Sequence, residues 1–304
     1  MNLSGVITQL ISLFLMMFVG YLVARAGIMT PEFRARLSSY TLSCVAPFAI
    51  LSAVLESDST PVTMLSAVGV SFVFYIFMVI LAALLVRLAR TKKEERGWDQ
   101  LMLIFTNVGF MGIPVIQSVY GADGVARLSM FILMFNLFFF SYGILLIASG
   151  EKINFKAMLN PCIVGALCGL LCGTTGLRFP AVIEDTMASI GAMNTPLAMM
   201  IIGGSVAHSD VFAALRNPRL YRVTALRMLV MPVLIMLAML PLPFDRMLVG
   251  ISVLLAAMPI GGNCSMVANI YAPGDMSSSH ATIISTLSSA VTLPLICALL
   301  TAVL

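Results

Sequence analysis

Two short stretches determine the fold that this sequence predicts: Thr106-Asn107-Val108-Gly109-Phe110-Met111-Gly112-Ile113-Pro114 and Met258-Pro259-Ile260-Gly261-Gly262-Asn263-Cys264-Ser265. Each lies inside a long apolar segment and combines two glycines, one proline and one asparagine. Proline removes a backbone donor and clashes with the preceding helical turn, and glycine has a weak helical preference. We therefore expect two apolar helices that lose regular structure in the middle.

The rest of the chain is strongly apolar. Of its 304 residues, 60% are hydrophobic and 10% are charged, and the mean hydropathy is +1.05. Soluble domains carry about 25% charged residues and could not cover so large a core with polar surface. The composition excludes a cytosolic enzyme, a disordered chain and a nucleic-acid binder. It predicts an all-α polytopic membrane protein.

A bilayer-spanning helix needs about 20 apolar residues. Ten such spans are predicted, at residues 4–25, 36–56, 63–88, 98–119, 124–148, 157–176, 181–207, 219–240, 245–272 and 278–303. Of the 17 basic residues, 13 fall in the loops on one side and three in those on the other. Because cytoplasmic loops are rich in Lys and Arg, both termini are predicted to lie outside.

An internal repeat relates the two halves of the chain. A shift of 149 positions aligns every Gly and Pro between residues 20 and 60 with an identical residue, as Gly20 with Gly169, Gly27 with Gly176, Pro31 with Pro180 and Pro47 with Pro196. Five spans per half is an odd number, so residues 1–150 and 151–304 would enter the membrane in opposite directions. Such inverted repeats are common in secondary transporters. The broken spans four and nine then correspond, and Pro47 and Pro196 are predicted kinks or hinges.

Broken helices at corresponding places in two repeats indicate a binding site near the bilayer midplane. The half-helix N-terminal ends there carry partial positive charge, and Asn side chains add neutral donors and acceptors. No acidic residue lies in mid-span near either break, which favours a small organic anion over a cation. The candidate substrate-binding residues are Asn107, Gly109, Gly112, Pro114, Pro259, Gly261, Gly262, Asn263, Ser265 and Asn194.

Several residues leave alternatives open. Asn194 can contact the substrate or form an interhelical hydrogen bond. Arg227, inside span eight, can snorkel to the cytoplasmic face, form a gating pair or contact the substrate. No metal site and no cofactor are expected, and the coupling ion, H⁺ or Na⁺, is open. The sequence contains no GxSxG, HExxH or Walker A motif, so neither an intramembrane hydrolase nor an ATP-driven pump is supported.

At Asn107–Pro114 and Ser285–Pro294 the chain resembles the auxin efflux carrier family, in particular its bacterial permease-like members. The resemblance covers nearly the whole chain. It implies ten spans in two inverted sets, with spans four and nine crossing where they unwind, and an elevator-type carrier that is often dimeric. It places Asn107 and Pro114 in the first crossover and Pro259 in the second. Family members of this kind export indole carboxylates or are linked to malate- or malonate-like acids.

The function expected from these observations is secondary transport of a small organic anion, in a bacterial-type inner membrane, by elevator-type alternating access, with no enzymatic activity. The alternatives are a sodium- or proton-coupled symporter of another organic anion, an anion channel, or a membrane receptor that transports nothing. The expected partners are the anion, the lipid bilayer and a second copy of the chain in a homodimer, and no nucleic acid.

Overall fold

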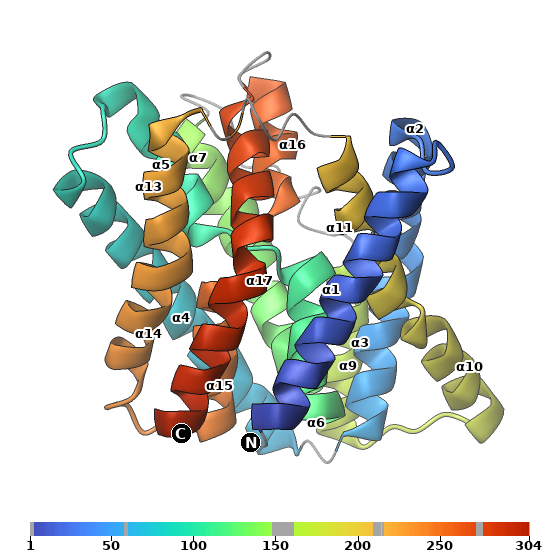
Figure 1. Ribbon diagram of the computed structural model, residues 1–304. Coiled ribbons are helices and arrows are strands. Elements are labelled where there is room, and N and C mark those ends of the chain that lie inside the picture. Colours follow the sequence, from blue (N-terminus) through green and yellow to red (C-terminus); the bar gives the residue numbers. More distant parts are fainter. Residues whose placement is uncertain are drawn as a thin grey trace. The chain divides into compact units, whose positions relative to one another are not determined.

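The computed structural model describes residues 3–57, 60–147, 161–208, 214, 216–271 and 276–303 (Figure 1). The described residues form helices, with one isolated β-bridge. Seven helical stretches are long and apolar enough to cross a membrane: Ile7–Arg25, Pro31–Glu56, Pro61–Leu88, Val108–Ile147, Ala181–Ala207, Pro218–Met239 and Ser277–Val303. Two shorter apolar helices cover Pro161–Thr175 and Arg246–Ala257. The protein is therefore an all-helical polytopic membrane protein.

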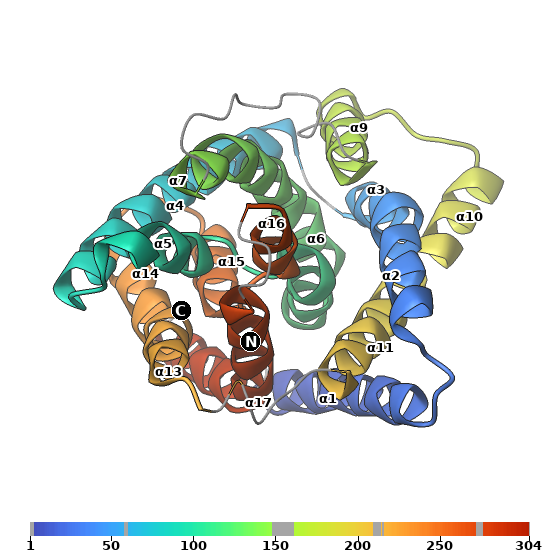
Figure 2. The ribbon, with the colours of Figure 1, turned by 90° about the horizontal axis from the view of Figure 1, so that it is seen from above.

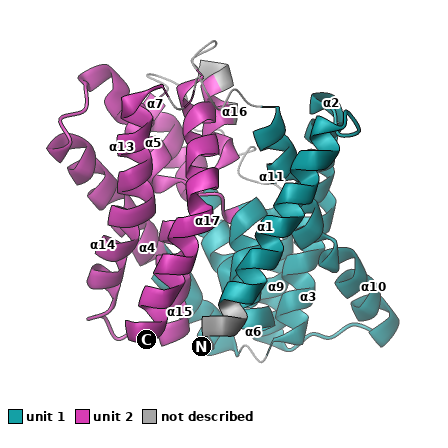
Figure 3. Ribbon diagram, in the orientation of Figure 1, with its two compact units in different colours: residues 1–71, 109–136, 156–208 teal, residues 72–108, 137–155, 209–304 magenta. Residues whose placement is uncertain are grey.

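The chain divides into two compact units (Figure 3). Unit 1 comprises residues 1–71, 109–136 and 156–208, and unit 2 comprises residues 72–108, 137–155 and 209–304. Each unit thus takes segments from both predicted halves. The predicted junction between the halves, at residues 150 and 151, lies outside the described residues.

Unit 1 is built around two pairs of packed helices. Its helices are α1 (Leu3–Arg25), α2 (Pro31–Tyr40), η1 (Thr41–Val45), α3 (Ala46–Glu56), most of η3 (Val108–Gly112) and of α6 (Ile113–Phe138), α9 (Pro161–Thr175), α10 (Ala181–Ala192) and α11 (Asn194–Ala207). α1 packs against α11, and α3 packs against α9 and α10. The pairs α1 with α11 and α9 with α3 each join the first predicted span of one half to the second predicted span of the other.

Small residues allow these helices to approach closely. A Cβ atom at Gly20 of α1 would meet the backbone of Met200 on α11, and one at Gly165 of α9 would lie 2.9 Å from the Cα of Pro47 on α3. Backbones can come this near only where a side chain is missing.

Gly27 and Gly176, which the shift of 149 aligns, have the same backbone conformation. Their φ angles are 79° and 71°, in the left-handed region that glycine adopts without strain. Each follows a helix end and donates its N–H to a carbonyl of the last turn, at Ala24 and Cys172 respectively. Both are helix C-terminal caps of the kind that glycine favours.

Unit 2 contains most of α4 (Pro61–Leu88) and the helices that lead into both breaks. The others are η2 (Lys93–Glu95), α5 (Arg96–Ile104), η4 (Phe139–Gly143), α7 (Ile144–Ile147), α13 (Pro218–Ala225), η5 (Leu226–Val230), α14 (Met231–Met239), α15 (Arg246–Ala257), α16 (Gly262–Tyr271) and α17 (Ser277–Val303). α15 contacts α14 and α17, and the view from above shows it on the inner side of α14 (Figure 2). All residues from Leu248 to Ala257 are buried, so α15 forms the centre of this unit.

A buried ion pair holds the beginning of α5 to α13. Asp99 is 1% exposed, and its Oδ1 accepts hydrogen bonds from Nε and Nη2 of Arg219 at 3.0 and 2.7 Å. The Thr91 hydroxyl donates to the other carboxylate oxygen at 3.1 Å. The pairing gives the buried carboxylate the partners that it needs.

Three prolines each follow a π-helical segment by two residues. Pro47 follows η1, Pro114 follows η3 (Val108–Gly112) and Pro232 follows η5. A proline in a helix has no N–H and its ring clashes with the carbonyl four residues earlier. A wider π turn just before the proline absorbs that mismatch without ending the helix. The equivalent Pro196 instead follows the turn at Met193 that separates α10 from α11.

Candidate functional site

The structure breaks both of the helices that the sequence singled out. The first loses helical structure at Phe105–Asn107, between α5 and η3, and the second at Met258–Gly261, between α15 and α16. The two breaks lie side by side within unit 2, where Thr106 and Ile260 form an antiparallel β-bridge.

Backbone hydrogen bonds hold the two broken stretches together. The Asn107 N–H donates to the Pro259 carbonyl at 2.9 Å, and the Gly261 N–H donates to the Phe105 carbonyl at 3.1 Å. Two unwound stretches thus satisfy each other's polar groups, as buried non-helical backbone within a membrane requires. We call this paired structure, residues 105–107 with 258–261, the crossover.

A third element supports the crossover from α17. The backbone N–H of Ile260 donates to Oγ of Ser285 at 3.1 Å, and both residues are fully buried. The Ser285 hydroxyl in turn donates to the Thr282 carbonyl of its own helix at 3.0 Å. Ser285 lies in the stretch that carries the family resemblance, but the sequence did not indicate its role.

The breaks are narrower than the sequence predicted. Gly109, Gly112 and Pro114 lie in helical structure of η3 and α6, and Gly262, Asn263 and Ser265 lie in α16. The π turn of η3 accounts for the first difference, because it admits Pro114 into a continuing helix. In the second stretch, Pro259 precedes the point where α16 begins, so it places no strain on that helix.

The ten candidate residues are divided between the two units. Unit 2 brings together Asn107, Pro259 and Gly261 in the crossover, with Gly262 and Asn263 at the start of α16. Ser265 is farther along α16, where its Oγ lies 3.3 Å from the Thr282 hydroxyl oxygen. Gly109, Gly112, Pro114 and Asn194 belong to unit 1.

Two polar side chains of the crossover are buried. Asn107 is 9% exposed and Thr106 is 2% exposed. Among the described residues, Oγ1 of Thr106 has no hydrogen-bond partner. Buried polar atoms are nearly always paired, and an orphaned one at a break in two helices is a candidate contact for a bound molecule.

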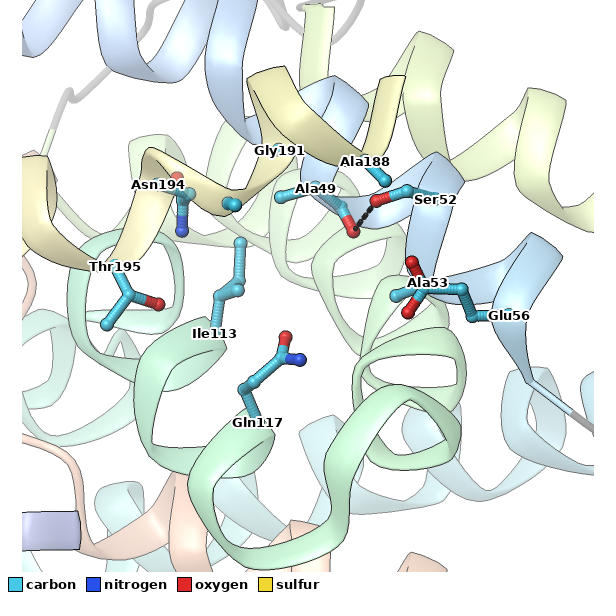
Figure 4. A pocket seen from close by; sticks show the side chains of 11 residues that line it. Ala49, Ser52, Ala53, Glu56, Ile113, Gln117, Ala188, Gly191, Asn194 and Thr195 are labelled. Carbon is cyan, nitrogen blue, oxygen red and sulfur yellow. Dashed lines mark hydrogen bonds between the residues drawn. The ribbon is translucent and has the colours of Figure 1, made fainter. Parts of the chain in front are cut away.

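Unit 1 contains a cavity of about 300 Å³, near the lower limit for small-molecule sites (Figure 4). Its polar lining consists of Ser52 and Glu56 of α3, Gln117 of α6, and Asn194 and Thr195 of α11. The remaining lining residues are Ala49, Ala53, Ile113, Ala188, Gly191 and Ala192.

Asn194 is the one sequence-predicted site residue in this cavity. Its side chain is 2% exposed and its Nδ2 has no hydrogen-bond partner among the described residues. The interhelical hydrogen bond considered as an alternative is therefore not made by that amide nitrogen. Gln117, a polar residue within an apolar span, was missed, although its position in that span was a usable signal.

Arg227 lies in η5 of unit 2 and is fully buried. Its guanidinium does not reach the surface, so snorkelling is the wrong interpretation. Nη1 donates to the Leu103 carbonyl at 2.9 Å, and Nη2 donates to the Leu255 carbonyl at 3.1 Å.

Long apolar helices, two of them broken and paired at their breaks, define a polytopic membrane protein with the discontinuous helices typical of transporters. The comparison with known families agrees. The family described as membrane transport protein matches residues 5–155 and again residues 146–297. The chain belongs to this family, that of the auxin efflux carriers, and is a transporter and not an enzyme.

A curated relative is similar along its whole length. An uncharacterized transporter of Methanothermobacter thermautotrophicus is 24% identical over 310 residues, which cover 97% of this chain and 98% of the relative. The double match to one family model is consistent with a repeat within the chain.

Proposed function

We propose that the protein is a secondary carrier of small organic anions, with the crossover as the place where the substrate's carboxylate binds. The observation that carries this proposal is the hydrogen-bonded pairing of Phe105–Asn107 with Met258–Gly261. Helical structure resumes directly after each break, at Val108 and Gly262. N-terminal helix ends carry partial positive charge and N–H groups that suit an anion.

The charges around the crossover fit an anion better than a metal cation. Among the described residues, the buried charged side chains are Asp99 and Arg227. Asp99 is already paired with Arg219, whereas Arg227 contacts the helices that lead into both breaks. A carrier built for a cation would be expected to present a membrane-buried carboxylate instead.

We further propose ten spans in two inverted repeats, residues 1–150 and 151–304. The helical stretch Val108–Ile147 has a non-helical residue, Gly121, with φ 64° and ψ −152°. It would therefore contain the end of span four and residues 124–147 of span five. α9 would be span six, and α15 with α16 would be span nine. The like packing of α1 with α11 and of α9 with α3 supports the repeat.

The division into units supports an elevator-type mechanism. Unit 1 takes the first two predicted spans of each half, and unit 2 takes the third span of each half together with both crossover stretches. One unit would be the scaffold and the other would move with the substrate. Asn194, which lines the cavity of unit 1, is proposed as a substrate contact within that unit, with Pro47 and Pro196 as hinges. Both termini outside, an inner-membrane location and a homodimer complete the proposal.

Transport by purified protein in liposomes tests this function. We expect uptake of labelled malate, malonate or an indole carboxylate to saturate and to show counterflow. Flux that rises with driving force without saturating, together with single-channel currents, would establish a channel instead. Binding without flux would establish a receptor. Replacing Na⁺, and separately collapsing the proton gradient, would identify the coupling ion.

Asn107→Ala tests the assigned carboxylate contact. A hydrogen bond to a charged group contributes about 1.5–3 kcal/mol, so we expect the KM for the anion to rise roughly tenfold or more. Asn263→Ala is the matched control from the other break, where the Asn lies within α16, and its effect should be smaller. Full wild-type affinity and flux in Asn107→Ala would remove this residue from the site.

A further inference from the structure

Arg227 is a buried cation that donates hydrogen bonds to backbone carbonyls. Its side chain is fully buried, and its two terminal nitrogens donate to Leu103 and Leu255 at 2.9 and 3.1 Å. Among the described residues, no carboxylate forms an ion pair with it. A buried arginine without an acid needs another source of negative charge.

The two carbonyls both lie in the last turn of a helix that ends at a break. Leu103 is in the last turn of α5, which ends at Ile104, and Leu255 is in the last turn of α15, which ends at Ala257. Carbonyls of the last helical turn lack the usual partner four residues on and form the negative end of the helix dipole. The Leu255 carbonyl also accepts the N–H of the cap residue Met258 at 3.2 Å, so Arg227 is its second donor. Arg227 therefore contacts the negative ends of both half-helices at once.

The geometry of the guanidinium explains why one side chain can hold two helices. Its donors are arranged in a rigid, planar fork, so Nη1 and Nη2 each meet a different helix end at a fixed spacing. η5, which carries Arg227, is the π segment that precedes Pro232. Its neighbour α13 is fixed to α5 by the pairing of Arg219 with Asp99. The helix that carries Arg227 is thus fixed in place next to α5.

We propose that Arg227 is a positioning residue of the crossover: its guanidinium clamps the C-terminal ends of α5 and α15 and neutralises their negative charge. What the crossover then presents to a ligand is the positive, N-terminal side of the two breaks. This gives an anion site without any Lys or Arg side chain that touches the anion. The proposal rests on the assignment of anion transport to the crossover.

Chemical rescue tests the proposal directly. Arg227→Ala removes the cation and leaves a space of the size of a guanidinium ion. We expect its KM for the anion to rise about tenfold or more relative to the wild-type protein, with a smaller change in maximal rate. Guanidinium ion, at a concentration too low to denature the protein, should restore much of the affinity. Urea has the same planar shape and similar donors but no charge, and should not restore it.

Two further variants separate charge from structure. Arg227→Lys keeps the charge but cannot hold two helix ends with a fork, so its KM should lie between those of the wild-type protein and Arg227→Ala. Arg87→Ala removes an exposed charge from α4 in the same unit, and its KM should equal the wild-type value. Thermal unfolding of each variant shows whether it is folded.

Hydrogen exchange supplies a reading that needs no substrate. In Arg227→Ala, amides of the crossover should exchange faster than in the wild-type protein, and guanidinium should slow them again. An unchanged KM, or a loss of uptake that guanidinium and urea affect equally, would overturn the proposal. So would exchange at the crossover that the substitution does not alter. Absence of anion uptake by the wild-type protein would instead refute the proposed function, and the exchange experiment would still decide whether Arg227 clamps the crossover.

Discussion

The two breaks have the same residue types but use them differently. In the first break, the paired residues Phe105–Asn107 contain no glycine, and Gly109 and Gly112 lie beyond them in η3. In the second break, Gly261 is itself one of the paired residues. A Cβ atom there would lie 2.7 Å from the Thr106 carbonyl oxygen. Close pairing of the two unwound stretches therefore requires a glycine in the second stretch only.

Gly261→Ala should have the largest effect of the substitutions that compare the breaks. The added Cβ would meet backbone, which cannot turn aside as a side chain can. Overpacking at a buried site costs about 1–3 kcal/mol. Here it would also weaken the two backbone hydrogen bonds that join residues 105–107 to residues 258–261. We expect a clear fall in the thermal unfolding midpoint and loss of most anion uptake.

Gly262→Ala is the matched control, one residue along the chain. Gly262 is exposed at the start of α16, and a Cβ atom there would meet nothing within 4 Å. Its unfolding midpoint should stay close to wild type. Equal effects of the two substitutions would show that the crowding at Gly261 is not what restricts that position.

Ser285→Ala should have the next largest effect, because it acts on the second break alone. The buried N–H of Ile260 would lose its acceptor, and leaving a buried donor unpaired costs about 1–3 kcal/mol. We expect a lower unfolding midpoint and faster hydrogen exchange at residues 258–261. In Ser252→Ala the lost hydroxyl bonds only its own helix, at the Leu248 carbonyl. If that control is as unstable as Ser285→Ala, the Ser285 contact has no special role.

The sequence located both breaks because proline and glycine are conspicuous inside apolar helices. It did not show which residues pair, because the pairing of Thr106 with Ile260 is made by backbone groups that every residue carries. The extent of the breaks was overestimated for a related reason. A proline stops a regular α-helix, but the sequence alone does not reveal that a π turn before Pro114 lets the helix continue.

Arg227 shows the same limit from another side. It donates to the carbonyls of Leu103 and Leu255, which are backbone groups of helices distant in the sequence. No pattern of acidic residues could therefore predict these partners. Asn194 is the opposite case. A polar residue beside a proline in an apolar span was enough to select it, and it lines the cavity of unit 1.

Gly109→Ala should have the smallest effect, and it tests whether glycine is needed in the first break at all. A Cβ atom at this position would lie 3.2 Å from Cδ2 of Leu42, the end of a flexible side chain that can move by a few tenths of an ångström. Alanine also favours helix over glycine by about 1 kcal/mol, which offsets that adjustment because Gly109 lies in η3. We expect an unfolding midpoint and a KM for the anion close to wild type. A large rise in KM with an unchanged midpoint would contradict this, and would mean that the backbone at Gly109 must approach the substrate too closely for any side chain.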